Sequence, residues 1–297
     1  MVAVTPATER PGTPATDRSG TGSPRPRLIA TDLDGTLLRD DKTVSDRTVE
    51  ALAAAERAGI EVFFVTGRPA RWMDVVSAHV HGHGLAICAN GAAVVDLHQG
   101  GRLIEVRPLD PASALAVVEA LRAAAPGTSF AVERTEGIFY EPEYPPFHLD
   151  PGAIHAPAEK LLDDGFAHAD QPIIKLLAHH REWAPDAFLE LGRSAAGEHG
   201  SFTRSSPTAL LEISGPGVSK ASTLELCCAE RGITAEEVVA FGDMPNDLEM
   251  LTWAGTSYAM ANAHPDVLAA TTHRTGANTE DGVAAVIERI LAGQSGR

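Results

Sequence analysis

Two acidic side chains follow the first apolar run of this sequence. Asp32 and Asp34 come directly after residues 28–31, which we expect to form a buried strand, and Gly35 permits a sharp turn beyond them. Because residues two positions apart in extended backbone point to the same side, both carboxylates would face one crevice. Carboxylates that converge in this way repel one another unless a cation lies between them. The spacing therefore indicates a site for a positive ion.

Further polar residues follow two other expected strands. Thr66 comes after residues 60–65, and Asp243 comes after residues 238–241. In an open parallel sheet, ligands bind at the carboxyl ends of the strands, so we expect these side chains beside Asp32. Ligands that offer only oxygen, without a nearby Cys or His, favour a hard cation, and Mg²⁺ is the cation we predict. Thr66 also suits the cap of a following helix, and the two roles are compatible.

One lysine stands at the start of an expected helix. Lys220 opens the segment 219–231, where a cation opposes the helix dipole. Residues that break a local rule often mark function. If Lys220 faces the carboxylates, it would neutralise both Asp32 and a bound phosphate. Taken alone, it is more simply interpreted as a solvated surface lysine.

The elements that would position these residues alternate regularly. Strands over 28–31, 60–65 and 85–89 are separated by helices over 45–58 and 69–80. This rhythm predicts a parallel sheet with right-handed crossovers. It resumes later in the chain, where helix and strand alternate again, over 219–231, 238–241, 246–253, 256–260 and 281–291.

The stretch between these two parts has a different rhythm. Residues 92–206 contain short apolar runs mixed with helices over 111–124 and 185–195, which predicts an α+β insert on a largely antiparallel sheet. The core would then comprise residues 27–91 and 207–297. The short strands expected after the first three lie at 92–96, 103–106, 129–133, 137–140, 173–178 and 209–213.

The composition narrows the classes of partner. Lys and Arg total 24 while Asp and Glu total 40, so the formal net charge is −16. This balance argues against nucleic acid and anionic membranes, because both bind basic surfaces. No apolar run approaches the ~20 residues that span a bilayer. Residues 1–26 are rich in Thr, Pro, Gly, Ser and Arg and lack the apolar region of a signal peptide, so we expect a disordered tail.

The three cysteines, Cys88, Cys227 and Cys228, form no CxxC pair. They match neither a disulfide framework nor a zinc site, so we expect buried thiols in a reducing cytoplasm. No feature of the sequence specifies an oligomeric state.

Four short motifs occur in a characteristic order: Asp32-Leu33-Asp34-Gly35-Thr36, Val65-Thr66-Gly67-Arg68, Lys220 and Gly242-Asp243-Met244-Pro245-Asn246-Asp247. In this order they resemble the motifs of the haloacid dehalogenase-like superfamily, and the resemblance extends from Arg27 to Leu291. Val218-Ser219-Lys220 and Asp281-Gly282-Val283-Ala284 are similar to its Cof-type phosphatase branch, although Ala221 stands where that branch often has Gly. The resemblance implies an α/β fold with a Rossmann-like parallel-sheet core and an inserted α+β cap domain.

The resemblance implies roles for the acidic residues. Asp32 would be the nucleophile that forms an aspartyl-phosphate, and Asp34 would be the general acid for the leaving alcohol and then the base for water. Asp32, the main-chain carbonyl of Asp34 and the Asp243 carboxylate would hold Mg²⁺. Asp247 would hold either a water molecule on the metal or the Lys220 side chain. An acid at Asp34 favours phosphate esters over haloalkanes, because an alkoxide leaving group needs a proton and a halide does not.

The remaining implied roles concern the phosphoryl group. Thr66, the main-chain N–H of Gly67, Asn246 and Lys220 would bind its oxygens. Positioning and charge neutralisation supply most of the catalysis in phosphoryl transfer. The cap would exclude bulk water and contact the leaving group, and we expect specificity to reside around residues 141–148 and 172–175.

These roles predict a cytoplasmic, Mg²⁺-dependent phosphatase for small phosphomonoesters such as sugar phosphates, nucleotides or phosphorylated cofactors. Two other functions stay open. A phosphotransferase or phosphomutase would use the same nucleophile with an acceptor other than water. A catalytically silent sensor of Mg²⁺ or of a metabolite would need neither Asp34 nor Lys220, and both residues are present.

Overall fold

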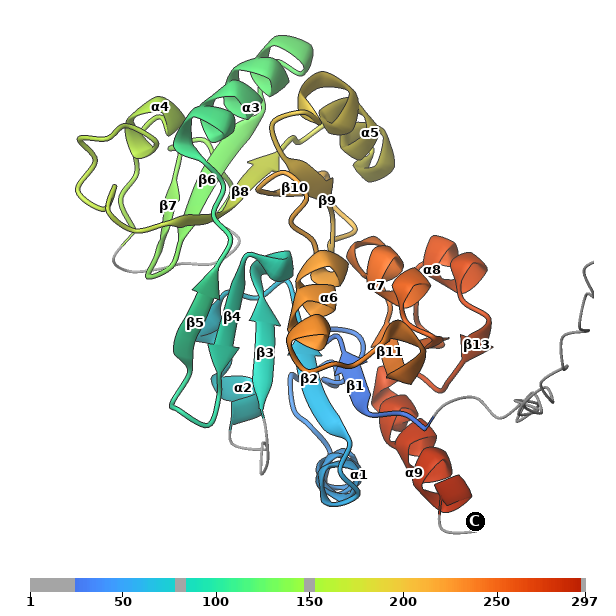
Figure 1. Ribbon diagram of the computed structural model, residues 1–297. Coiled ribbons are helices and arrows are strands. Elements are labelled where there is room, and N and C mark those ends of the chain that lie inside the picture. The colour runs from blue at the N-terminus through green and yellow to red at the C-terminus, as the bar shows by residue number, and fades with distance from the viewer. Residues whose placement is uncertain (1–24, 78–83, 147–152, 295–297) are drawn as a thin grey trace, which may run out of the picture.

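The computed structural model describes residues 25–77, 84–146 and 153–294, which form two β-sheets, one above the other in Figure 1. The lower sheet has eight strands and the upper sheet has five. The expected N-terminal tail, apart from its last two residues, lies outside the described residues.

The centre of the large sheet is parallel. β1 (Leu28–Thr31) pairs with β2 (Glu61–Val65) on one side and with β11 (Val238–Gly242) on the other. β3 (Leu85–Cys88) and β12 (Thr256–Ala259) continue the parallel part in the two directions. The full order is β13-β12-β11-β1-β2-β3-β4-β5. Every residue of β1, β3 and β11 is buried, as expected for parallel strands covered on both faces. The predicted α/β class with a parallel-sheet core is confirmed.

The first crossover shows how local sequence forms these elements. α1 (Asp46–Arg57) begins after Ser45, whose side chain accepts a hydrogen bond from the backbone N–H of Thr48. α1 packs against the last helix, α9 (Gly282–Gln294). The residues that α1 buries recur at helical spacing, and they are Thr48, Ala51, Leu52 and Ala55.

The other core elements are short, except for α6. They are η1 (Ala70–Trp72), α2 (Asp74–Ser77), η2 (Ala89–Gly91), α6 (Lys220–Glu230), η3 (Ala235–Glu237), η4 (Pro245–Asp247), α7 (Leu248–Trp253), α8 (Pro265–Ala270), β13 (His273–Arg274) and η5 (Asn278–Glu280). Of the helix expected over 69–80, the described residues contain only η1 and α2, and residues 78–80 lie outside them. The helix expected over 246–253 starts as the 3-10 turn η4.

The expected start of the insert at residue 92 is wrong for its first two strands. β4 (Ala93–Asp96) and β5 (Arg102–Val106) pair antiparallel on the edge of β3 and complete the large sheet. The chain reverses at η2, where Ala89, Asn90 and Gly91 all have positive φ. A hairpin can extend the free edge of a parallel sheet, and the residue pattern of a short strand does not specify which sheet it joins.

The smaller sheet is antiparallel throughout. Its order is β7 (Ile138–Tyr140), β6 (Ser129–Arg134), β8 (Ile173–His179), β10 (Leu210–Ser214) and β9 (Ser201–Thr203). Three helices belong to it, α3 (Pro111–Ala124), α4 (Ala158–Leu161) and α5 (Pro185–Ala196). They pack on an apolar face that includes Phe130, Val132, Leu176 and Leu211. Because side chains alternate along a strand, the opposite face carries Glu133, Lys175 and Glu212.

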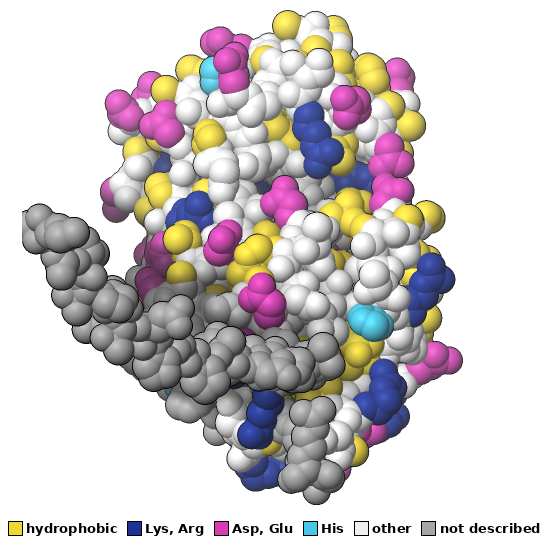
Figure 2. All heavy atoms as spheres, turned by 45° about the vertical axis from the view of Figure 1, so that its right-hand side comes forward, with side chains coloured by type: hydrophobic (Ala, Val, Ile, Leu, Met, Phe, Trp, Pro, Cys, Tyr) yellow, Lys and Arg dark blue, Asp and Glu magenta, His cyan; other side chains and the backbone are white. Residues whose placement is uncertain are grey.

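Two surface properties bear on partners. Within the part of the chain that the structure covers, none of the helices combines the length and hydropathy of a membrane span. On the face drawn in Figure 2, acidic and basic side chains are interspersed.

Candidate active site

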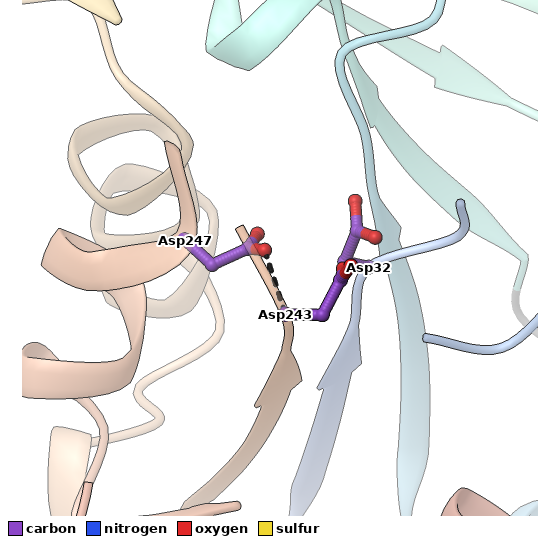
Figure 3. A group of neighbouring side chains, drawn as sticks. All are labelled: Asp32, Asp243 and Asp247. Carbon is purple, nitrogen blue, oxygen red and sulfur yellow. Dashed lines mark hydrogen bonds between the residues drawn. The ribbon is translucent and has the colours of Figure 1, made fainter. Parts of the chain in front are cut away.

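The candidate site lies where three adjacent strands end. Asp32 follows β1, Thr66 follows β2 and Asp243 follows β11. β1 pairs with both other strands, so the three chain ends are neighbours at one edge of the sheet. Figure 3 shows Asp32, Asp243 and Asp247 around one point above β1 and β11. Of the side chains expected to converge, Asp32 and Asp243 lie together in this group.

The three carboxylates form a compact acidic cluster. Asp32, Asp243 and Asp247 are all buried, and each offers an oxygen within 4.8 Å of the others. Thr36 Oγ1 donates to Asp243 Oδ1 over 2.9 Å and orients that carboxylate. Gly35, with φ +82°, passes so close that a Cβ at this position would collide with the Asp243 carboxylate. The turn after Asp34 therefore requires glycine for both its backbone conformation and its space.

Lys220 is the cation of this cluster. Its Nζ donates to Asp32 Oδ1 over 2.6 Å and to Asp247 Oδ1 over 2.7 Å. Only 1% of the Lys220 side chain is exposed, so it is not the surface lysine of the simpler interpretation. Burial lowers the pKa of Lys220, but the charges of Asp247 and Asp32 outweigh that effect and raise it above its usual value. Lys220 is therefore a fixed positive charge.

Burial dominates the protonation of the carboxylates. It raises the pKa of Asp32 well above its usual value, even though the Lys220 charge opposes that rise. Burial and the neighbouring Asp247 raise the pKa of Asp243 to about 7. When all three are ionised, three carboxylates against one ammonium group carry excess negative charge, and all the offered ligand atoms are oxygens. This donor set fits a hard divalent cation.

Asp247 connects the lysine to the loop that carries Asp243. Its Oδ2 accepts a hydrogen bond from the backbone N–H of Asp243 over 3.0 Å (Figure 3). The same oxygen accepts one from the backbone N–H of Met244 over 3.0 Å. Its Oδ1 accepts from Lys220. Of the two contacts expected for Asp247, the one with Lys220 is present.

The Asp34 carboxylate is bound by two cations outside the acidic cluster. It accepts two hydrogen bonds from Arg68, over 2.5 and 2.7 Å, and one from Lys42 Nζ over 2.8 Å. Burial raises its pKa, but the bonds from Arg68 and Lys42 outweigh burial and lower the pKa to about 2. No motif drew attention to Lys42, which reaches Asp34 because the chain after Asp34 folds back, with Arg39 N donating to Thr43 O.

The residues expected to bind phosphoryl oxygens are adjacent. Thr66 is buried, and its Oγ1 accepts from the backbone N–H of Arg68 over 3.1 Å, as in a cap. A Cβ on Gly67 would lie 3.8 Å from Asn246 Nδ2 and 3.2 Å from Asn90 Oδ1. Asn246 Nδ2 donates to Asn90 Oδ1 over 3.1 Å.

Two residues that border this group, Asn90 and Glu212, were not singled out from the sequence, and a third, Lys175, was included only in the stretch 172–175 expected to set specificity. Asn90 stands at the carboxyl end of β3, and Lys175 and Glu212 belong to the smaller sheet. Lys175 Nζ donates to the carbonyl oxygen of Gly67 over 2.8 Å, and Asn90 Nδ2 donates to Glu212 Oε2 over 2.8 Å. A signal was present: Lys175 and Glu212 are charged residues with apolar neighbours on both sides in their strands.

Known proteins resemble this chain over most of its length. The family model for haloacid dehalogenase-like hydrolases matches residues 29–287. A 5-amino-6-(5-phospho-D-ribitylamino)uracil phosphatase of Bacillus subtilis is 30% identical over 275 residues, covering 90% of this chain and 98% of its own. A pyridoxal phosphate phosphatase of Escherichia coli is 30% identical, covering 88% and 97% of the two chains.

Solved structures give the same result. A haloacid dehalogenase-like hydrolase from B. subtilis superposes with a TM-score of 0.73 at 26% identity and covers 88% of this chain and 99% of its own. The motifs, the fold and these relatives lead to one conclusion: the chain belongs to the haloacid dehalogenase-like hydrolases, in their Cof-type phosphatase branch.

Proposed function

We propose that this protein is a Mg²⁺-dependent phosphatase that hydrolyses small phosphomonoesters through an aspartyl-phosphate on Asp32. The observation that carries the proposal is the buried pair of Lys220 and Asp32, set against Asp243 and Asp247 at the carboxyl ends of β1 and β11. A buried carboxylate held by one oxygen beside a fixed cation suits attack on an anionic phosphoryl group.

The first step is displacement at phosphorus. Lys220 holds Oδ1 of Asp32, so we assign the attack to Oδ2. The new bond joins Oδ2 to phosphorus while the ester P–O bond breaks and its electron pair stays with the leaving oxygen. Thr66, the N–H of Gly67 and the Asn246 amide would bind the equatorial oxygens, with Lys220 neutralising their charge. A hydrogen bond from Thr66 to a charged oxygen should contribute about 1.5–3 kcal/mol.

Asp34 would exchange protons with the leaving oxygen and then with water. Its low pKa keeps it ionised while Arg68 and Lys42 hold it, which suits the base for hydrolysis of the aspartyl-phosphate. For the acid step it must gain a proton. A phosphoryl group bound beside Gly67 would attract Arg68, weaken its hold on Asp34 and raise the pKa of that carboxyl.

Asp32, Asp243 and the main-chain carbonyl of Asp34 would hold the Mg²⁺. When bound, the ion supplies positive charge that offsets the acidic cluster and the phosphoryl oxygens. Asp247 would act through Lys220 and through the loop that it closes.

The substrate class is a small phosphorylated metabolite. The relatives act, by their names, on pyridoxal phosphate and on a phosphoribitylamino-uracil. We propose that the smaller sheet with its helices is the cap that contacts the leaving group, including the described part of residues 141–148 and residues 172–175.

We also propose a cytoplasmic location, because the three cysteines are buried and free.

A phosphate-release screen over many phosphomonoesters in MgCl₂ tests this function. Wild type should release inorganic phosphate with water as the sole acceptor, which also excludes a phosphotransferase. Asp32→Asn should lower kcat at least ~1,000-fold, and a chelator should abolish turnover until Mg²⁺ is restored. Equal activity in Asp32→Asn would contradict the assignment of Asp32 as the nucleophile. Tight ligand binding without turnover in the wild type would favour a sensor.

A further inference from the structure

A chain of hydrogen bonds runs from the smaller sheet to the group that would bind phosphate. It starts at Glu212 on β10, passes through Asn90 after β3 and ends at Asn246 in η4. Glu212 and Asn90 are almost fully buried. Three elements that are distant in sequence therefore meet at Gly67, whose Cα faces all three side chains.

Glu212 determines the direction of every bond in this chain. Its Oε2 accepts from Asn90 Nδ2 over 2.8 Å and from Lys175 Nζ over 3.1 Å, and its Oε1 accepts from Ser205. Burial raises the pKa of Glu212, but Lys175 and the other donors outweigh burial and lower it. Glu212 is therefore an ionised carboxylate, which can only accept hydrogen bonds.

This acceptor constrains the two amides in turn. Asn90 must direct its NH₂ group to Glu212, so its oxygen faces Asn246. Asn246 must then direct its own NH₂ group to Asn90. One N–H of that group binds Asn90, and the second is available beside Gly67 for an anionic oxygen.

The orientation of the Asn246 amide leaves its own oxygen without a hydrogen-bond donor among the described residues. Within the described residues, Asn246 Oδ1 is buried and accepts no hydrogen bond. An unsatisfied buried acceptor is unfavourable, and rotation of the amide by 180° would instead set two oxygens, from Asn90 and Asn246, against each other. The contact with Asn90, fixed by Glu212, therefore imposes the orientation.

We propose that Glu212 is a positioning residue for phosphoryl binding, which acts through Asn90 to present the NH₂ group of Asn246. Lys175 assists from the same sheet, because it binds both Glu212 and the carbonyl oxygen of Gly67. This inference rests on the proposed function, in which Gly67 and Asn246 bind phosphoryl oxygens. It assigns part of the phosphate site to the smaller sheet, to which the proposed function gives contact with the leaving group.

The test measures binding of inorganic phosphate in MgCl₂ by calorimetry, and KM and kcat with p-nitrophenyl phosphate. Glu212→Gln keeps the shape of the side chain, but its amide can turn either the NH₂ donor or the oxygen acceptor toward Asn90. We expect phosphate to bind about tenfold more weakly and KM to rise about tenfold, while kcat changes less than threefold, because the lost contact is made equally in the ground state and in the transition state.

Glu133→Gln is the matched control. Glu133 is as deeply buried on the same face and lies 3.2 Å from Lys175, but it makes no hydrogen bond to Asn90 among the described contacts. Its phosphate affinity should stay within twofold of wild type. An equal loss in Glu133→Gln would overturn the proposal, because it would indicate a general effect of the buried charges.

Asn90→Gly gives a second, independent test, because glycine accepts the φ of +55° at this position. It should weaken phosphate binding as Glu212→Gln does, and the double variant should show no further loss. Unchanged phosphate affinity in Glu212→Gln, or fully additive losses, would reject the relay. Phosphate binding needs no turnover, so this result is separate from the Asp32→Asn test of the proposed function.

Discussion

The Nζ atom of Lys220 lies 2.6 Å from Oδ1 of Asp32, although 188 positions separate the two residues in the chain. The same nitrogen lies 2.7 Å from Asp247. All three groups are buried, so each carboxylate depends on the lysine for its counter-charge.

Lys220→Met should therefore damage both stability and turnover. Two buried carboxylates would lose their shared cation, and breaking a buried pair costs about 3–5 kcal/mol in the free energy of unfolding. The loss of one group that stabilises the transition state should lower kcat at least ~100-fold. Urea denaturation and steady-state kinetics at pH 7 measure the two effects. Lys160→Met, at an exposed site on α4, should change neither, and wild-type kcat in Lys220→Met would contradict its role.

Gly35→Ala should impair the chemistry more than the fold. A Cβ at Gly35 would displace the Asp243 carboxylate, whereas Gly59 has nearly the same φ, +79°, with nothing within 4 Å. Both substitutions carry a backbone penalty of about 1–2 kcal/mol. Only Gly35→Ala should also lower kcat/KM, by about 100-fold, because misplaced groups are costly in catalysis. Equal kcat/KM in the two variants would show that Asp243 need not be held there.

The pH dependence of stability should report on Asp243. Burial and Asp247 hold its pKa at about 7 in the folded, metal-free chain, while an unfolded Asp titrates near ~3.9. The folded state binds this proton more tightly, so the stability it contributes is present below the unfolded pKa and is lost as pH rises to about 7.

Urea titrations of the chelated protein between pH 4 and 8 measure this effect. Wild type should lose more free energy of unfolding across that range than Asp243→Asn does. Mg²⁺ should raise Tm more at pH 8 than at pH 5, because the ion binds deprotonated carboxylates. Parallel pH profiles for the two proteins would show that Asp243 titrates normally.

Asp34→Asn should separate the two chemical steps. p-Nitrophenolate leaves without a proton, so formation of the aspartyl-phosphate should remain fast with p-nitrophenyl phosphate. Its hydrolysis should slow by about 10²–10⁴ for lack of a base, which gives a burst of p-nitrophenol in rapid-mixing experiments. With an alkyl phosphate both steps should slow and no burst should appear. Lys42→Met, at the exposed partner of Asp34, should keep kcat within several-fold of wild type.

The sequence predicted the residues that converge better than the contacts that orient them. Asp32, Thr66 and Asp243 were found because polar residues at the ends of parallel strands meet at one edge, a rule that needs only strand order. The orientation of Asp34 toward Arg68 and Lys42 could not be predicted. The contact with Lys42 depends on how the segment after Asp34 folds back, which no short pattern encodes.

The same difference separates the two sheets. The strands β6, β8 and β10 were predicted from their apolar runs, but β4 and β5 were assigned to the wrong sheet. The expected boundary at residue 206 also left β10 in the core, whereas it belongs to the smaller sheet. Sheet membership depends on which edge is free when the chain reverses at Asn90, and that is a tertiary property. Glu212 was overlooked for a related reason, and Lys175 was expected only to affect specificity, since the partners of both residues belong to the other sheet.

The hydrogen bond from Asn90 to Glu212 also limits how such a protein can be re-engineered. Exchange of residues 108–214 for the equivalent module of a homologue is an obvious route to a chimera with a new preference. Such a graft would succeed only if the donor module brings an anionic acceptor to the place opposite Asn90. A donor module that lacks one should yield a chimera that accepts the leaving group of the new substrate but binds its phosphoryl group weakly.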